Sequence, residues 1–196
     1  MDNFFVVDLT VRKGVKKMNP SFRTERLSIR NFILEDAPKV QKLLEDGEIA
    51  QTTTIIPYPL PDKFAEDWIS KIKNSMVSKD SFHFAIFNEQ DHFIGCIYIF
   101  INKKHNKGEL GYWLGKSYRN KGYCTEAGEE IIKFGFEDLG LNRIFADAFT
   151  KNTASSKVME KLGLKYEGTF KQSCLYRGVY EDTVIYGITK DDYYSK

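Results

Sequence analysis

The chain has 196 residues, of which 42% are hydrophobic and 29% are charged. These proportions are typical of a soluble globular domain, and they exclude a disordered or a fibrous protein. Lysine and arginine together number 29 against 27 aspartates and glutamates, so no strong overall field would draw the chain to nucleic acid or to an anionic membrane. We therefore expect one packed domain that holds any anionic ligand through local groups.

The cysteines and histidines form neither a disulfide pattern nor a metal-binding pattern. Cys96, Cys124 and Cys174 are scattered along the chain, and the three histidines lack the spacing of zinc ligands. We therefore expect reduced thiols and no metal. The longest apolar run, residues 93–101, is far shorter than the roughly 20 residues of a membrane-spanning helix, and the N-terminus has no signal-peptide core. The sequence thus predicts a cytoplasmic protein.

The first twenty residues precede the first clear domain pattern. We expect residues 1–20 to form a leader and residues 21–196 to form a single domain. Met18 makes an alternative translation start one interpretation of the leader. An extra strand is the other, because apolar residues such as Phe4 and Val6 alternate loosely with polar ones.

Hydrophobic periodicity predicts an alternation of strands and helices along the domain. A strand at 27–32 precedes a helix over 37–44, a proline-rich loop follows at 52–61, and a second helix begins at Phe64. The later predicted elements are strands at 82–87, 93–101 and 109–114, a helix from the 115–122 turn to about 139, a strand at 143–149, a helix at 153–162 that Gly163 caps, and strands at 165–171 and 179–188. This order indicates an α/β fold with a mixed sheet.

The turn between the strand at 109–114 and the following helix has the features of an anion site. It contains Arg119, Lys121 and Gly122, immediately before the helix begins. The first turn of a helix leaves backbone N–H groups unpaired at the positive end of the helix dipole. Because glycine has no side chain, a diphosphate could approach the backbone closely at Gly122. Basic turns before helices are common, however, so this feature alone identifies no ligand.

Three motifs, in the right order, together resemble the GNAT superfamily of N-acetyltransferases. Residues 119–124 read Arg-x-x-Gly-x-Cys and resemble its acetyl-CoA signature, which normally ends in glycine or alanine. Residues 109–114 resemble the strand that receives the pantetheine arm, and the segments 152–155 and 160–164 resemble the next helix of that family. The resemblance covers residues 23–190 and is closest to the RimJ/RimL branch, which acetylates the N-termini of ribosomal proteins.

The resemblance implies the GNAT fold, in which helices flank a mixed central sheet, and acetyl-CoA as the acetyl donor. It also implies direct attack by the acceptor amine, without a covalent enzyme intermediate. A backbone N–H near Trp113 or Leu114 would polarise the thioester. The residues implied to bind acetyl-CoA are Trp113, Leu114, Arg119, Asn120, Lys121, Gly122, Tyr123, Cys124, Thr125 and Asn152.

The resemblance also suggests the catalytic residues. Ser155 matches the serine that faces the cofactor sulfur in the ribosomal branch, whereas many other members carry a tyrosine acid where this chain has Met159. Glu109 would accept the amine proton through a water, or would be a solvated carboxylate at a strand end. Asn152 would bond the pantetheine amides, or would serve only as a helix cap. Cys174 occupies the position of a glutamate that the branch places near the acceptor.

The acceptor is expected to enter between the 52–61 loop and the turn at 176–178, where Tyr58, Trp68 and Tyr176 are candidate lining residues or ordinary packing. The first reading of the acceptor is a protein or peptide N-terminal amine, because residues 52–61 contain no acidic residue to attract a cation. A polyamine or aminoglycoside is the second, and a non-catalytic acetyl-CoA-binding module is the third. The sequence leaves open whether the chain forms a homodimer.

Overall fold

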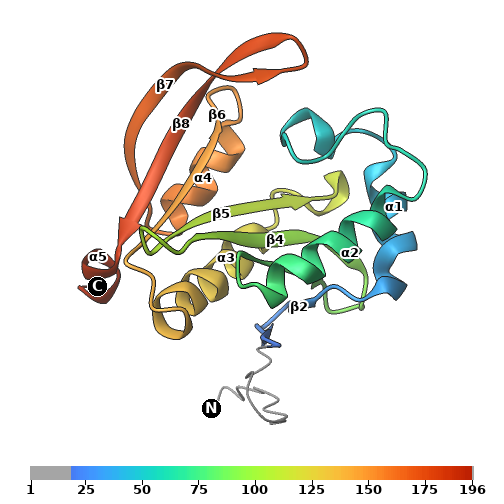
Figure 1. Cartoon of the computed structure of the whole chain (residues 1–196), viewed down its shortest axis with the longest axis horizontal. Coiled ribbons are helices and arrows are strands. Elements are labelled where there is room, and N and C mark those ends of the chain that lie inside the picture. Colours follow the sequence, from blue (N-terminus) through green and yellow to red (C-terminus); the bar gives the residue numbers. More distant parts are fainter. Residues whose placement is uncertain (1–18, 196) are drawn as a thin grey trace.

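The computed structural model describes residues 19–195 and shows one mixed sheet with helices on both faces (Figure 1). The eight strands lie in the order β1-β2-β3-β4-β5-β6-β8-β7. Their bounds are β1 Ser21–Arg23, β2 Ser28–Asn31, β3 Ser81–Phe87, β4 Phe93–Asn102, β5 Lys107–Leu114, β6 Arg143–Phe149, β7 Lys165–Tyr176 and β8 Val179–Thr189. The α-helices are α1 Ala37–Leu44, α2 Phe64–Val77, α3 Tyr123–Lys133, α4 Thr153–Lys161 and α5 Lys190–Tyr194.

Two hydrophobic clusters bury the two faces of the sheet, as the period of two in the strands requires. In β4, Ile97 and Ile99 point to the face that α3 and α4 cover, whereas Cys96 points to the face that α1 and α2 cover. All three side chains are fully buried. The α/β fold with a mixed sheet that the sequence predicts is therefore confirmed. No helix among the described residues is long and apolar enough to span a membrane.

The predicted elements are present close to their expected positions, with differences in length. β7 continues to Tyr176 rather than 171, and the regular part of α3 ends at Lys133, where a π-helical turn, Phe134–Asp138, follows. β1 and α5 were not predicted, because elements of three and five residues are too short to show a period. Gly163 has a φ of 81°, the left-handed conformation expected of a helix cap. The leader, residues 1–18 in particular, lies outside the described residues, so both interpretations of it stay predictions.

The two central strands β5 and β6 separate at their C-terminal ends. They pair in parallel only from Lys107–Arg143 to Glu109–Phe145, although β5 continues to Leu114 and β6 to Phe149. Figure 1 shows β6 leaning away from β5 beyond this point. Backbone N–H and C=O groups on the facing edges of the two strands therefore need partners other than each other. The opening between the strands is the natural place for a ligand that offers amide groups.

The turn of the β7–β8 hairpin reaches across to the loop that follows α1. The Tyr176 hydroxyl donates a hydrogen bond to the backbone oxygen of Ala50, and Arg177 Nη2 donates to the same oxygen over 3.3 Å. The Arg177 guanidinium also lies 5.2 Å from the centre of the Tyr58 ring. These contacts join the two segments that were predicted to flank the acceptor, and they roof the opening between β5 and β6.

Candidate active site

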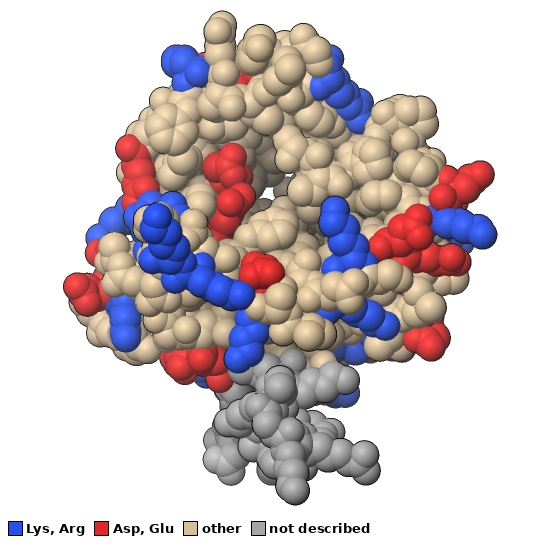
Figure 2. Space-filling model, in the orientation of Figure 1, with Lys and Arg blue, Asp and Glu red and all other residues tan. Residues whose placement is uncertain are grey.

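A cavity of about 760 Å³ occupies the opening between β5 and β6 and the space beneath the hairpin. Figure 2 shows this hollow near the centre of the molecule, with red aspartate and glutamate side chains beside it. The predicted site residues on its wall are Glu109, Trp113, Leu114, Arg119, Asn120, Gly122, Tyr123, Cys124, Thr125, Asn152 and Ser155. Lys121 is the exception, because the turn directs its ammonium over the Tyr118 ring, 5.9 Å from the ring centre.

The start of α3 presents free N–H groups to one end of this cavity. The Glu126 N–H donates to the Gly122 oxygen over 3.0 Å, so the N–H groups of residues 123–125 come before the first bond of the helix ladder. Asn120 and Gly122 have φ values of 61° and 84°, which turn the backbone into the helix. A Cβ atom built on Gly122 would meet only Arg26 Nη2, at 3.2 Å. The turn therefore has the open backbone and the positive dipole end that bind phosphate.

Arg26, which sequence reasoning missed, fastens this turn to the N-terminal strands. Its Nε and backbone N–H donate to Glu126 over 2.8 and 3.0 Å, and its Nη1 donates to the Lys121 oxygen over 3.0 Å. Its guanidinium also lies 4.9 Å from the centre of the Tyr123 ring. Burial alone would raise the pKa of Glu126, but hydrogen bonds from Thr24 and Arg26 outweigh burial and lower it. Glu126 therefore stays ionised at neutral pH and keeps its ion pair with Arg26.

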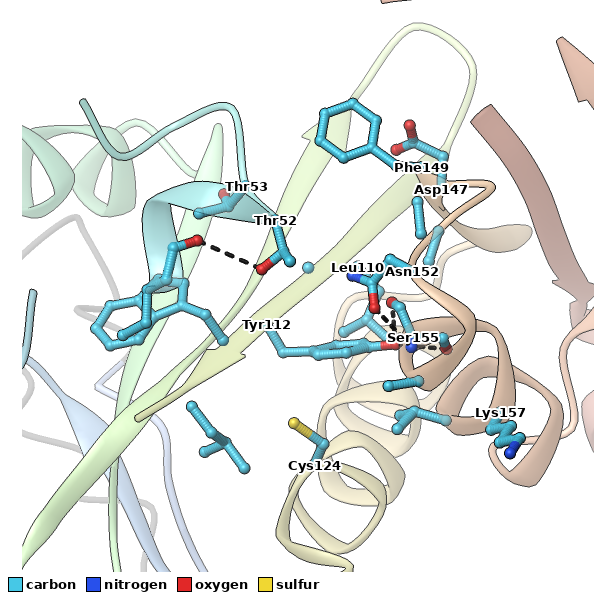
Figure 3. Close-up of a pocket in the computed structure, with 18 of the residues that line it drawn as sticks. Thr52, Thr53, Leu110, Tyr112, Cys124, Asp147, Phe149, Asn152, Ser155 and Lys157 are labelled. Carbon is cyan, nitrogen blue, oxygen red and sulfur yellow. Dashed lines mark hydrogen bonds between the residues drawn. The ribbon is translucent and has the colours of Figure 1, made fainter. Parts of the chain in front are cut away.

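Two hydroxyl groups meet where α4 faces β5 (Figure 3). The Tyr112 hydroxyl lies 2.9 Å from Ser155 Oγ and 3.1 Å from the Ser155 backbone oxygen, to which it can only donate. Burial raises the pKa of Tyr112. Asn152 Oδ1 caps α4 by accepting from the Ser155 N–H over 3.2 Å, and the Asn152 side chain still lines the cavity. Met159 is fully buried in the core, one helical turn after Ser155 on α4.

Two carboxylates from neighbouring strands line the same cavity. Glu109 lies opposite Phe145 in the parallel pairing, and Asp147 follows two residues later on the same face of β6. Burial and the negative charge of Asp147 raise the pKa of Glu109, while Lys107 opposes them. Loss of hydration within the cavity also raises the pKa of Asp147. Sequence reasoning missed Asp147 because a polar residue in an alternating strand looks like an ordinary solvent-facing position.

The side of the cavity beyond these carboxylates has an aromatic and hydroxyl-bearing wall. Figure 3 shows Phe149 and Asp147 on one side, with Thr52 and Thr53 across from them. Cys174 lies on the wall as well.

The three aromatic residues suggested for this wall, Tyr58, Trp68 and Tyr176, are not among the residues that line the cavity. Trp68 packs against Phe32 with ring centres 5.0 Å apart, and Tyr58 and Tyr176 form the roof contacts with Arg177 and Ala50. The packing interpretation is therefore the one that the structure supports for Trp68.

The thiol and basic groups on the wall complete its chemistry. Burial, opposed by the charge of Arg119, raises the pKa of Cys124 to about 12, so the thiol stays protonated and is a poor nucleophile. Lys157 and Lys161 on α4 join Arg119 as cations on the cavity wall. Residues 19–195 contain no group of three or more histidine, cysteine, aspartate or glutamate side chains placed to hold a metal ion.

Known proteins resemble this chain in both sequence and fold. The profile of the family described as "Acetyltransferase (GNAT) domain" matches residues 26–165. An uncharacterized N-acetyltransferase of Bacillus licheniformis, p20, is 31% identical over 172 residues, which cover 87% of this chain and 96% of p20.

Solved structures agree with this assignment. A GNAT-family acetyltransferase from Bacillus anthracis is 27% identical with a TM-score of 0.75, covering 87% of this chain and 99% of that one. RimL, a ribosomal L7/L12 alpha-N-protein acetyltransferase solved with coenzyme A, shares the fold with a TM-score of 0.80 at 18% identity, covering 86% of this chain and 97% of RimL. The matched family and the relatives show that the chain belongs to the GNAT family of N-acetyltransferases.

Proposed function

We propose that this N-acetyltransferase moves the acetyl group of acetyl-CoA to the N-terminal amine of a protein or peptide, with ribosomal proteins as the leading class. The observation that carries the proposal is the opening between β5 and β6, with the phosphate-binding turn before α3 at one end and Glu109 and Ser155 inside it. The same cavity can thus hold a diphosphate, an extended amide-bearing arm and a reacting amine.

The cavity wall suits each part of acetyl-CoA. The N–H groups of residues 123–125 would receive the pyrophosphate, with Arg119, Lys157 and Lys161 adding positive charge. The unpaired edges of β5 and β6 would bond the pantetheine amides, and the Asn152 side-chain amide can donate to them while its oxygen caps α4. A backbone N–H near Trp113 or Leu114 would polarise the thioester oxygen.

The residues divide the proton transfers between them. Burial and the charge of Asp147 raise the pKa of Glu109, which makes this carboxylate a stronger base. Glu109 would take the proton of the acceptor ammonium through a water. The amine nitrogen then bonds to the acetyl carbon as the carbon–sulfur bond breaks, and the nitrogen releases its second proton to solvent as the amide forms. Ser155 Oγ would protonate the departing sulfur, held in position by Tyr112, and solvent would restore both groups after the products leave. Asp147 would supply a carboxylate near the acceptor. In the ribosomal branch a glutamate supplies that carboxylate, at the position that Cys174 occupies in this chain.

A small cationic amine is the second candidate acceptor. The pair of carboxylates, Glu109 and Asp147, favours it, since a polyamine or aminoglycoside carries several positive charges.

A panel assay decides between the two candidates. It contains a free N-terminal peptide, the same peptide with a blocked N-terminus and an internal lysine, spermidine and an aminoglycoside. Mass spectrometry is expected to find acetyl only on the free N-terminus; acetylation of the small amines alone would overturn the peptide reading. Binding without turnover on any amine would indicate a non-catalytic module.

Ser155→Ala is expected to lower kcat by about 100-fold, a typical contribution of a positioned proton donor. The dissociation constant of acetyl-CoA should be unchanged, because the hydroxyl acts on the sulfur only as the bond breaks. Steady-state kinetics and calorimetry measure the two quantities. Ser156→Ala makes the same chemical change one residue away, outside the cavity wall, and should retain activity. Full turnover in Ser155→Ala would remove this residue from the mechanism.

Arg26→Gln is expected to raise the KM for acetyl-CoA by about tenfold, the scale of one charge-assisted hydrogen bond, with a smaller change in kcat. The reason is that the turn before α3 would lose its links to Lys121 and Glu126. Arg26→Lys should recover little, because an ammonium cannot reproduce the fork of bonds. Arg23→Gln, an exposed change on β1, is the control. A uniform loss of kcat with unchanged KM would contradict a role in holding the turn.

A further inference from the structure

A second cavity, of about 510 Å³, adjoins the first at the end of the sheet near the β4–β5 turn. Phe100 and Glu109 lie on the walls of both cavities. An acceptor could therefore enter through the second cavity and place its amine at Glu109. The rest of the acceptor would then lie in the second cavity. None of the residues assigned to acetyl-CoA lines this space, so it belongs to the acceptor side of the site.

The strand register sets the charges on this face. Lys107 and Glu109 are two residues apart on β5, so both side chains lie on the same face of the sheet. Phe145, opposite Glu109, lines the second cavity, and the Lys107 ammonium lies 5.1 Å from the centre of its ring. Asp147 follows on β6. The face thus carries a positive charge at the outer end and two negative charges toward the reacting centre.

Of the two lysines that line this cavity, Lys107 is the one without an ion pair among residues 19–195, and its charge also acts on Glu109 two residues along β5. Lys103 pairs with Asp80 over 2.8 Å. Arg143, whose guanidinium lies 6.0 Å from the centre of the Phe145 ring, pairs with Glu167. The contact of Lys107 with Phe145 places the ammonium over the aromatic ring. An anionic group bound in the second cavity would form an ion pair with the Lys107 ammonium.

We infer that the second cavity binds the part of the acceptor directly behind the reacting amine, and that Lys107 selects acceptors that carry a carboxylate there. The preferred class is then a peptide whose N-terminal residue is followed by aspartate or glutamate. A polyamine would place a second ammonium beside Lys107 and would be disfavoured by like-charge repulsion. The inference rests on the proposed transfer to an amine and narrows its acceptor.

Three peptides that differ only at positions two and three, with Asp-Asp, Asn-Asn or Lys-Lys, test this selection. Wild type is expected to show a kcat/KM about tenfold higher for the acidic peptide than for the basic one at low salt, the scale of one charge interaction. Lys107→Met, which keeps the apolar stem over Phe145, should remove most of this preference, and Lys107→Glu should reverse it. The KM for acetyl-CoA should stay unchanged in both variants.

Lys104→Glu is the matched control, because it makes the same charge change in the adjoining β4–β5 turn without lining the second cavity. Equal kcat/KM for the three peptides in wild type, or the same shift in Lys104→Glu as in Lys107→Glu, would overturn the inference.

If wild type acetylates no peptide, the peptide proposal has failed separately, and lysine against cadaverine becomes the comparison. These amines differ by one carboxylate; faster acetylation of lysine than of cadaverine would support the role of Lys107. Faster acetylation of cadaverine, or of neither, would overturn it.

Discussion

Gly122→Val is expected to abolish the stabilisation that acetyl-CoA gives the protein. Gly122 has a φ of 84°, a left-handed conformation that a β-branched residue adopts only at a cost, and its open side is where a pyrophosphate would approach. The melting temperature of wild type should rise with acetyl-CoA, by an amount that corresponds to about 2.7 kcal/mol at one hundred times the dissociation constant. The variant should show no such rise.

Gly140→Val separates this effect from backbone strain. Gly140 also has a left-handed φ, 65°, and a Cβ there would meet no atom within 4 Å. This variant should start from a lower melting temperature and still gain the full shift from acetyl-CoA. A normal shift in Gly122→Val would show that the turn before α3 does not hold the pyrophosphate.

Glu109→Gln is expected to lower kcat/KM by at least about 100-fold, because the amide cannot accept a proton. In wild type, kcat/KM should fall as the pH decreases through the raised pKa of Glu109, since protonation removes the base. Asp147→Asn removes a negative charge that contributes to this rise. The acid limb of its pH profile should therefore move toward lower pH.

The pH profiles of wild type and Asp147→Asn provide the check, with the acceptor far below its KM so that kcat/KM is measured directly. The direction of the shift distinguishes the two roles of Asp147. If Asp147 only binds the acceptor, its replacement lowers kcat/KM at every pH and leaves the acid limb in place. An unmoved limb, or near-normal activity of Glu109→Gln, would show that Glu109 is the solvated strand-end carboxylate.

The features predicted correctly from sequence are those that depend on neighbouring residues. The turn at 119–124, the helix after it and the cap at Gly163 follow from local backbone requirements, and the structure shows each. Ser155 and Glu109 were placed by their position in motifs, and both line the cavity. Their catalytic roles stay predictions.

The features that were missed depend on contacts between distant segments. The patterns of β5 and β6 alone do not show that the strands stop pairing after Glu109, because both continue as regular strands; only the resemblance to the family implied a splayed strand end there. Arg26 meets Lys121 and Glu126 only after folding. Lys121 was placed at the site by its charge and by its position in the family signature, but the turn directs its side chain to Tyr118.

Calorimetric titration of the wild-type protein with acetyl-CoA, and separately with CoA, tests most directly whether the opening between β5 and β6 is a cofactor site. The account predicts saturable binding of both ligands at one site per chain, in the micromolar range. Absence of saturable binding at millimolar acetyl-CoA would contradict it, and would leave the chain with the fold of its family but without the use of the cavity proposed for it.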